Sequence, residues 1–424
     1  MLHIPRSLLR GSGAVVPMPF ACRCCGAPLE DTFADLGVAP LADAFVPPDR
    51  VGAMEAFHPL HILVCSDCNL VQLPAPVTPV RRDAVDPPSG AAWRLREAEA
   101  FAAEMAERFS LDPATPVTEV SSGDGSRLHG FARLGIPVLG LEPCAAAAQV
   151  ALARGIPTEL TGFGADAARR LRMAGHEPVL ITAVDVMAQV ADLHDLLAGF
   201  RSLLAPGGVL VLEVPHVLRL MVDGRVDSIR HARLSYFSLA TAEMALLQHG
   251  LVIFDVEELA THGGSLRIFA RHVEDRGKPL TQAVARMRLL EKAGGLTNPG
   301  AYRAFAAQVV EIKCALLDFL VGAHRAGKRV AAYGAPARGN TLLNYCGVGP
   351  ELLAFTVDPS PQLQGMLLPG SRIPVRPPEA IMQERPDFVV ILPSDRKDEI
   401  TAALHPIRQW GGRFVVPIPT VQIF

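Results

Sequence analysis

The sequence contains no long apolar run, although half of its 424 residues are hydrophobic. A helix that crosses a membrane needs roughly 20 consecutive apolar residues, so we expect no membrane association. The chain also lacks a dense block of lysine and arginine, and its formal net charge is only −3. Because nucleic-acid binding requires a basic footprint, we expect no nucleic-acid partner.

The first 20 residues lack the continuous apolar segment of a secretory signal peptide. They carry Arg6 and Arg10 among scattered apolar residues, so we interpret 1–20 as a flexible extension and expect a cytoplasmic protein. Thiols stay reduced in that compartment, which favours metal binding over disulfides for paired cysteines. The length also exceeds what a single core supports, so two or three domains are expected.

Five of the eight cysteines lie within the first 70 residues, and four of them form two CxxC pairs. Cys22 and Cys25 form the first pair, and Cys65 and Cys68 form the second. Each pair can present two thiolates from one tight turn, and two pairs complete a closed tetrahedral site for a structural Zn²⁺ ion. We therefore expect a zinc-binding domain over 21–85. Cys24 is surplus, although it could substitute for one of the ligands.

The stretch from Pro116 to Pro143 predicts a strand, a loop of small residues, a helix and a second strand. The loop runs from Ser121 to Gly125, and the second strand ends on Glu142. In doubly wound sheets such a unit binds a nucleoside, with the acid accepting hydrogen bonds from the ribose hydroxyls. The GxGxxG spacing that cradles phosphates is absent, which favours S-adenosylmethionine over a dinucleotide. An ordinary strand–helix–strand turn of an α/β core is the alternative interpretation.

The rest of the middle region continues the alternation of helices and strands that is typical of an α/β domain over 86–272. We expect helices over 93–109 and 193–204, and strands over 179–184 and 209–214. Asp185 follows the first of these strands. A second α/β domain is expected over 273–424 after a helical linker, with helices over 280–290 and 305–320. There, a glycine-containing loop over 334–340 precedes a short helix over 341–345 and could hold an anion on its backbone N–H groups.

Taken together, several stretches make the chain resemble the sugar C-methyltransferases of deoxysugar biosynthesis. These stretches span nearly the whole chain: PLADAF, CSDCNLVQL, GLEP, LLAPGGVLVLEVPHVLRL, LSYFSLATAEMALLQHGL, THGGSLRIFARH, GAPARGNTLLNYCGV and WGGRFVVPIP. The resemblance implies a zinc-binding domain, a Class I Rossmann-like methyltransferase domain and a C-terminal Rossmann-like α/β domain. It also implies methylation, by S-adenosylmethionine, of a carbon next to a ketone on a nucleotide-linked sugar.

The resemblance also identifies the residues expected to bind ligands. The expected donor-binding residues are Glu119, Ser121, Gly123, Asp124, Glu142, Pro143, Asp185 and Gln189. The expected acceptor-binding residues of the second half are His262, Arg338 and Asn340. His262 could equally be a core histidine, and the loop at Arg338 could equally be a structural turn.

The chain departs from the family pattern where the chemistry is expected. The family segment that reads roughly Tyr-His-Glu-His is Arg230-His231-Ala232-Arg233 here. Arginine keeps its proton at any working pH, so Arg233 cannot replace a basic histidine. The family's Asn-Val-Leu-Ala-His is Asp185 to Gln189, and serine occupies the first glycine position of the donor loop.

These departures predict a changed substrate or mechanism. We expect His231 or Tyr236 to supply any proton transfer, and Arg230 and Arg233 to orient an anionic small-molecule substrate. The two arginines could instead reach solvent or pair with nearby acids. Two other functions remain open from the sequence: a non-methylating rearrangement, condensation or epimerisation on the same scaffold, and an inactive paralogue that binds a ligand or a partner.

Overall fold

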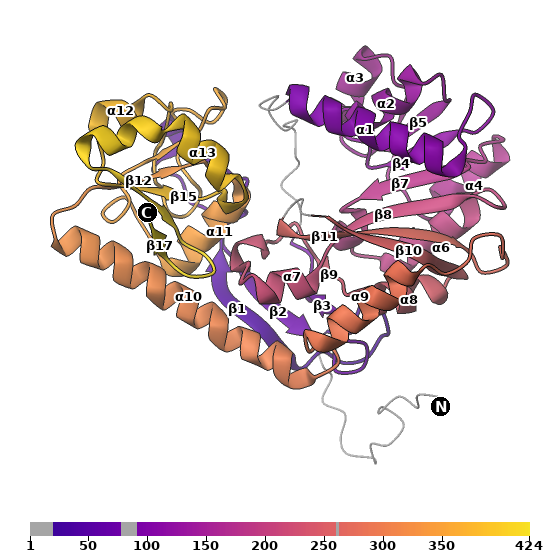
Figure 1. Cartoon of the computed structure of the whole chain (residues 1–424), viewed down its shortest axis with the longest axis horizontal. Coiled ribbons are helices and arrows are strands. Elements are labelled where there is room, and N and C mark those ends of the chain that lie inside the picture. The colour runs from indigo at the N-terminus through magenta and orange to yellow at the C-terminus, as the bar shows by residue number, and fades with distance from the viewer. Residues whose placement is uncertain (1–19, 78–90, 260–262) are drawn as a thin grey trace.

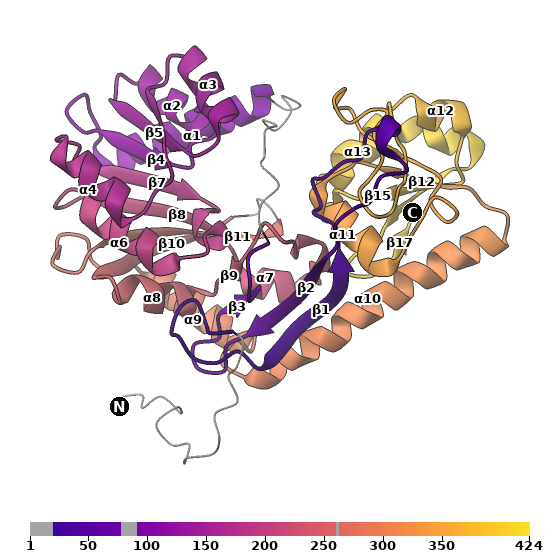
Figure 2. The ribbon, with the colours of Figure 1, turned by 180° about the vertical axis from the view of Figure 1, so that it is seen from behind.

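The computed structural model describes residues 20–77, 91–259 and 263–424. His262 and the predicted extension up to residue 19 lie outside the described residues. The described chain contains three sheets, which lie side by side (Figure 1). A long helix, α10 (Pro299–Arg325), runs beneath the first and third of them (Figure 2).

A seven-stranded sheet occupies the middle of the sequence in the order β10-β11-β8-β7-β4-β5-β6. Its five parallel strands are β4 (Val117–Val120), β5 (Val138–Glu142), β6 (Thr158–Leu160), β7 (Leu180–Val184) and β8 (Val209–Pro215). Two antiparallel strands, β10 (Leu251–Leu259) and β11 (Ser265–His272), extend the sheet beyond β8. Every residue of β8 is buried, as expected for a central strand that is covered on both faces.

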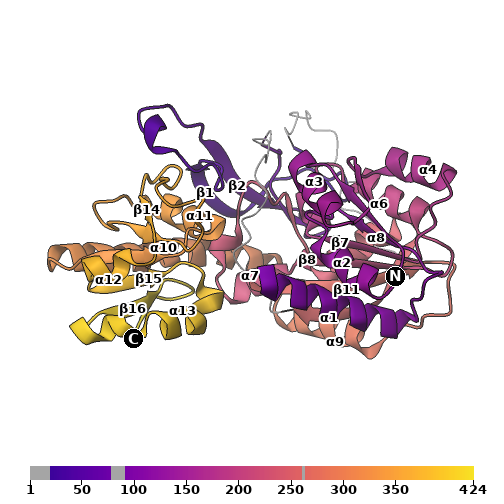
Figure 3. The same ribbon diagram turned by 90° about the horizontal axis from the view of Figure 1, so that it is seen from above.

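Helices cover both faces of this sheet, as Figure 3 shows from above. One face carries α1 (Ala91–Phe109), α2 (Ser126–Arg133) and α3 (Ala145–Ala153). The other carries α4 (Ala165–Met173), α6 (Leu193–Leu203), α8 (Leu239–Leu247) and α9 (Gln282–Ala293). The order of connections reverses between β4 and β7, because the chain proceeds from β4 to β5 on one side and from β7 to β8 on the other. In sheets of this kind the ligand crevice lies at the carboxyl ends of the strands beside such a reversal.

The first sheet has the order β1-β2-β3-β9 and joins two distant parts of the chain. Its first three strands are β1 (Asp31–Ala39), β2 (His58–Val64) and β3 (Val71–Gln72). The fourth, β9 (Ser235–Tyr236), comes from the segment after β8 and pairs with β3. The arginine-rich segment 230–233 is therefore held directly against the cysteine-containing region.

The third sheet has six strands in the order β14-β13-β12-β15-β16-β17. These strands are β12 (Val330–Tyr333), β13 (Thr356–Val357), β14 (Val375–Arg376), β15 (Phe388–Ile391), β16 (Arg413–Val416) and β17 (Gln422–Ile423). Its helices are α11 (Ala337–Cys346), α12 (Ala380–Glu384) and α13 (Lys397–Ala403). Helix α10 joins this sheet to the first, because Phe305 stacks on Phe33 of β1 with ring centroids 4.7 Å apart.

The predicted starts of two helices were wrong by four or more residues. Helix α10 begins at Pro299 and not at Phe305, because Asn298 accepts a hydrogen bond from the N–H of Gly300 and proline fits the first helical position. Helix α11 begins at Ala337 and not at Thr341, because Pro336 adopts an extended conformation at the cap position and the helical conformation starts with the next residue. Arg338 and Asn340 therefore lie on the first turn of α11, and not in a loop.

Candidate active site and metal centre

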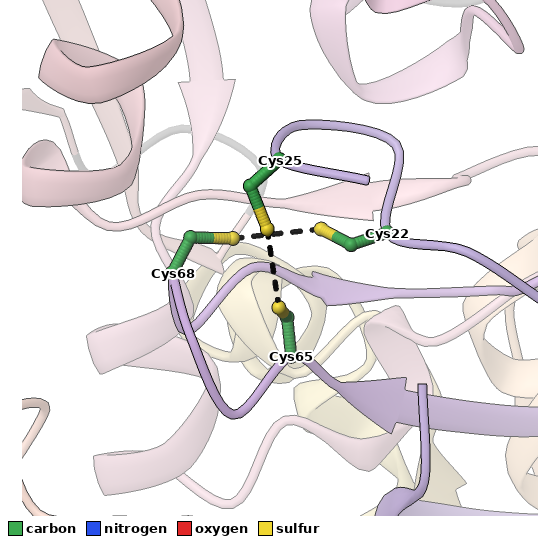
Figure 4. Close-up of side chains that lie close together, drawn as sticks. All are labelled: Cys22, Cys25, Cys65 and Cys68. Carbon is green, nitrogen blue, oxygen red and sulfur yellow. Dashed lines mark hydrogen bonds between the residues drawn. The ribbon is translucent and has the colours of Figure 1, made fainter. Parts of the chain in front are cut away.

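The four predicted zinc ligands converge on one point. The Sγ atoms of Cys22, Cys25, Cys65 and Cys68 all lie within 4.8 Å of one another (Figure 4). Each CxxC pair sits on a turn that closes on a residue with positive φ, Gly26 in one case and Asn69 in the other. The N–H of this residue donates to the carbonyl oxygen of the first cysteine, at 2.9 Å in both turns.

The dimensions of the cluster fit zinc. Zn–S bonds of about 2.3 Å in a tetrahedron place the sulfur atoms about 3.8 Å apart. The Sγ–Sγ distances are 3.5 Å between Cys22 and Cys68 and 3.5 Å between Cys25 and Cys65. Four thiolates fill a tetrahedral shell, so the residues present suit a structural ion that has no open coordination position.

Arg23 connects this cluster to the middle domain. Its Nη1 donates to the carbonyl oxygen of Leu234 at 2.8 Å, and its Nη2 donates to that of Leu73 at 3.1 Å. Its Nε donates to the carbonyl oxygen of Ala191 at 3.0 Å. Gln72 completes the connection, since its Oε1 accepts from the Arg23 backbone N–H and its Nε2 donates to Cys22 Sγ. The rigid guanidinium fork therefore braces the segments that follow Asp185 and Arg233.

We expect Arg23→Ala to lower the free energy of unfolding by about 2–4 kcal/mol. Its removal leaves the carbonyl groups of Leu73 and Leu234, which belong to buried residues, without this donor, and an unsatisfied buried polar group costs about 1–3 kcal/mol. Arg23→Lys should recover only part of this loss, because an ammonium group cannot reproduce the fork. Urea unfolding of the zinc-loaded proteins measures both effects. An alanine variant as stable as the wild type would contradict this bracing role.

The loop after β4 has the backbone shape expected of a ligand-binding turn. Ser121, Gly123 and Gly125 have φ values of 55°, 57° and 74°. A Cβ atom added at Gly123 would meet no atom within 4 Å, so the backbone is open on that side. Ser121 adopts a left-handed conformation that normally favours glycine, so the loop keeps this backbone shape although serine stands here.

Glu142 ties this loop to the end of β5. One carboxylate oxygen accepts from the N–H of Gly123 at 2.7 Å, and the other accepts from the N–H of Cys144 at 2.8 Å. Pro143 between them is exposed. Asp124 accepts from the hydroxyl of Ser126 at 2.6 Å and pairs with Arg154 at 2.7 Å. The acid at the tip of the second strand thus lies with the loop at the carboxyl ends of β4 and β5, where sheets of this kind bind their ligands.

Glu119 lies beneath this loop, within the sheet. Its Oε1 is 3.3 Å from Nε of Arg127, whereas its Oε2 is buried without a hydrogen-bond partner among the described residues. Burial raises the pKa of Glu119 to about 8, although the charge of Arg127 opposes the shift. These contacts give Glu119 a place in the core of the fold, and its predicted contact with the donor stays a prediction.

We expect Glu119 to make the protein less stable as the pH rises. The unfolded chain loses this proton near pH 4.5, whereas the folded chain keeps it until about pH 8, so stability falls across that interval. Glu119→Gln removes the effect and should be the more stable protein at pH 8.5, by up to about 4 kcal/mol. Urea unfolding from pH 5 to pH 9 tests this, with the exposed Glu159→Gln as the control. A constant difference between wild type and Glu119→Gln would contradict it.

Asp185 and Arg233 form an ion pair at the carboxyl end of β7. Asp185 follows β7 directly, and its Oδ2 accepts from Nη2 of Arg233 at 2.8 Å. The Arg233 side chain is 3% exposed and the Asp185 side chain 16%. Both Arg233 and Arg230 have a buried Nε atom without a hydrogen-bond partner among the described residues. Burial lowers the pKa of Arg230 to about 10, and the neighbouring charge of Arg233 adds to the shift.

His231 and Tyr236, the two residues predicted to transfer protons, are hydrogen-bonded to backbone groups of the protein. His231 Nε2 lies 3.2 Å from the carbonyl oxygen of His58, and burial lowers the pKa of His231. The hydroxyl of Tyr236 accepts from the N–H of Arg230 at 3.2 Å and donates to the carbonyl oxygen of Ser228 at 3.4 Å. Burial raises the pKa of Tyr236. Their catalytic roles stay predictions, and the contacts show both side chains holding the backbone around Arg230.

The third-domain residues lie on the first turn of α11. Arg338 pairs with Asp395 at 2.7 Å, and its Nη1 is buried without a partner among the described residues. Asn340 Nδ2 donates to the carbonyl oxygen of Ala42 at 3.3 Å, which ties α11 to the loop after β1. The predicted Gln189, at the end of the short helix α5 (Val186–Gln189), is exposed.

Three family models match the chain in succession. A putative zinc-binding domain matches residues 22–81, a methyltransferase domain 92–256 and a C-methyltransferase C-terminal domain 260–419. The C-methyltransferase NovU of Streptomyces niveus is 32% identical over 415 residues, which are 95% of this chain and 96% of that protein. The chain belongs to the C-methyltransferase family.

Solved methyltransferase structures match part of the chain. A magnesium protoporphyrin IX methyltransferase from Synechocystis with bound S-adenosylmethionine is 14% identical, with a TM-score of 0.32, and covers 42% of this chain and 79% of its own. A methyltransferase from Anabaena variabilis is 13% identical, with a TM-score of 0.35, and covers 46% of this chain and 96% of its own.

Family membership confirms the expected fold and cofactors. The protein is an S-adenosylmethionine-dependent C-methyltransferase with a Rossmann-like methyltransferase domain and a structural zinc ion. Within the described residues, no helix is both long enough and apolar enough to span a membrane.

Sequence reasoning missed two elements that position this C-methyltransferase site. Arg23 was not singled out, since a basic residue inside a CxxC pair has no distinctive spacing. Glu291 of α9 was also missed; its Oε1 is 3.0 Å from His216 Nε2, and both oxygens accept N–H groups at the start of α8. A glutamate in an amphipathic helix is common, so nothing in the sequence indicated that Glu291 contacts His216 and the start of α8.

Proposed function

We propose that this C-methyltransferase acts on a small anionic acceptor, and that it adds the methyl group to a carbon atom next to a carbonyl group. A nucleotide-linked keto sugar of deoxysugar or antibiotic biosynthesis is the acceptor class that the family resemblance favours. We further propose that the reaction takes place in the cytoplasm. Family membership does not favour a non-methylating reaction or an inactive paralogue.

The observation that supports an anionic acceptor is the pair of arginines beside Asp185. Each has a buried Nε without a hydrogen-bond partner among the described residues, and the negative charges that act on Arg230 are those of Asp185 and Asp43. A buried donor without an acceptor is costly, so an acceptor that brings anionic oxygen atoms would be favoured here. Arginine forks also orient carboxylate and phosphate groups in a defined geometry.

The crevice residues divide between the two ligands in this proposal. The loop at Gly123 and Asp124, with Glu142 and Pro143, binds the nucleoside end of the donor. Asp185 and the turn that ends at Gln189 face the transferred methyl group. S-adenosylmethionine, when bound, supplies an electrophilic methyl group on a sulfonium centre. On the acceptor side, Arg230 and Arg233 hold the anionic group, while His262, Arg338 and Asn340 contact the distal part of the molecule.

The test is to incubate the zinc-loaded protein with ¹³C-methyl-labelled S-adenosylmethionine and a panel of nucleoside-diphosphate keto-deoxysugars. We expect the NMR spectrum of the product to show a new methyl group bonded to carbon. Arg230→Gln should lose this product, whereas the exposed Arg169→Gln should form it at the wild-type rate. A methyl group on oxygen or nitrogen, or no transfer to any acceptor, would overturn the proposal.

A further inference from the structure

We propose that the Asp185 carboxylate is the general base that removes a proton from the acceptor carbon. This inference rests on the proposed function, because methylation of a carbon next to a carbonyl group requires loss of that proton. It assigns a role to a residue that was expected only to adjoin the methyl donor.

Three other groups near Arg230, those of Arg233, His231 and Tyr236, are less suited to act as the base because of their chemistry or their contacts. Arg233 keeps its proton throughout the working pH range. Burial lowers the pKa of His231, and its Nε2–H donates to the carbonyl oxygen of His58. Tyr236 has its hydroxyl between two backbone groups, and burial raises its pKa. Arg233 has no site for another proton and Tyr236 would have to break a buried contact, while Nδ1 of His231 has no hydrogen bond among the described residues that would orient it toward a ligand.

Asp185, in contrast, is oriented and partly open. It lies at the carboxyl end of β7, beside the reversal of strand order, and its φ of 60° is a conformation that non-glycine residues seldom adopt. Such backbone strain is retained mainly at functional sites. Arg233 fixes Oδ2 at 2.8 Å, while Oδ1 has no hydrogen-bond partner among the described residues. A carboxylate held by one oxygen can use the other as a base.

Arg230 lies where it can stabilise the negative charge that develops on the enolate oxygen when the proton is removed. The charges of Arg233 and Asp185 both act on its guanidinium group, as does that of Asp43 in the loop after β1. Its Nε is buried and has no partner among the described residues. A donor that is already desolvated stabilises an enolate oxygen without reorganising solvent. Asp185 and Arg230 together therefore provide a base and an oxyanion-stabilising group.

The step conserves atoms and charge. The C–H bond next to the carbonyl group breaks, its proton passes to Oδ1 of Asp185, and its electron pair forms an enolate whose oxygen faces Arg230. The enolate carbon then bonds to the methyl carbon of the donor, and the electron pair of the broken C–S bond stays on sulfur. Asp185 finally releases its proton to water.

Proton uptake tests this assignment without the natural acceptor. Oxalate is a planar dianion that resembles an enolate, and its binding would reproduce the state in which Asp185 is protonated. We would saturate the protein with S-adenosylhomocysteine and titrate oxalate by calorimetry in two buffers with different ionisation enthalpies. The wild type, Asp43→Asn and the exposed Asp166→Asn should each take up a proton on binding. Asp185→Asn should bind oxalate without uptake, and Arg230→Gln should bind it about tenfold more weakly.

The outcomes separate this inference from the proposed function. A wild type that fails to bind S-adenosylhomocysteine would contradict the proposed function itself. Normal binding of that ligand together with no oxalate binding, no proton uptake, or unchanged uptake in Asp185→Asn would overturn only the role of Asp185. If Asp185→Asn does not fold, infrared difference spectra of Asp43→Asn, recorded with and without oxalate, replace the calorimetry. A protonated carboxyl band that appears on oxalate binding supports the assignment to Asp185, and its absence overturns it.

Discussion

Replacing Cys68 with serine is expected to release the zinc ion and unfold the region around the first sheet. Zinc binding by four thiolates contributes on the order of 10 kcal/mol to folding in small zinc domains, and serine does not replace a thiolate ligand. The loss should reach the active site, because Cys22 is hydrogen-bonded to Gln72 and Arg23 reaches Leu234 from the same turn. Zinc content per chain and the melting temperature measure the effect.

Two other cysteines provide controls for this prediction. Cys24 lies within the same turn but outside the group of four, and Cys314 is exposed on α10. Cys24→Ser and Cys314→Ser should both keep a full complement of zinc. Retention of zinc by Cys68→Ser, or its loss from Cys24→Ser alone, would show that the ligand set is wrong.

Replacing Asp185 with alanine is expected to destabilise the protein by about 3–5 kcal/mol. The change leaves the Arg233 guanidinium, which is 3% exposed, without its counter-charge, and an uncompensated buried charge carries a cost of this size. Replacing both members of the pair, in Asp185→Ala with Arg233→Met, should recover much of the loss, because no charge is then left unpaired. Urea unfolding of the wild type, both single variants and the double variant gives the coupling energy.

The control for this cycle is Asp166→Ala with Arg169→Met, a surface pair whose side chains are 84% and 67% exposed. Its coupling energy should stay below about 1 kcal/mol. Additive effects at Asp185 and Arg233, with no recovery in the double variant, would mean that the two side chains do not form a buried pair in solution.

The parts of the site that the sequence predicted depend on short-range patterns. The CxxC spacing indicated the zinc ligands because each pair needs only one turn. The end of a buried strand indicated the positions of Glu142 and Asp185, because the carboxyl ends of parallel strands share one edge of the sheet. The substitutions at Arg230 and Arg233 were visible as departures from the family pattern, and the structure brings Arg233 to Asp185.

The parts that could not be predicted depend on contacts between distant segments. Pairing of Ser235–Tyr236 with Val71–Gln72 joins two-residue strands that carry no periodic signal. No pattern in the sequence places Glu119 beneath the loop after β4 beside Arg127, since an acid at the end of a strand fits a ligand contact equally well. Local propensity cannot decide such cases, because burial and partners depend on the assembled sheets.

The central claim is that the crevice framed by Gly123, Glu142 and Asp185 binds the methyl donor. Calorimetric titration with S-adenosylhomocysteine tests it most directly, with Glu142→Ala compared with the exposed control Glu159→Ala. We predict saturable binding of one ligand per chain to the wild type and the control, and a loss of at least about tenfold in affinity for Glu142→Ala. No binding to the wild type, or equal affinity in Glu142→Ala, would contradict the claim.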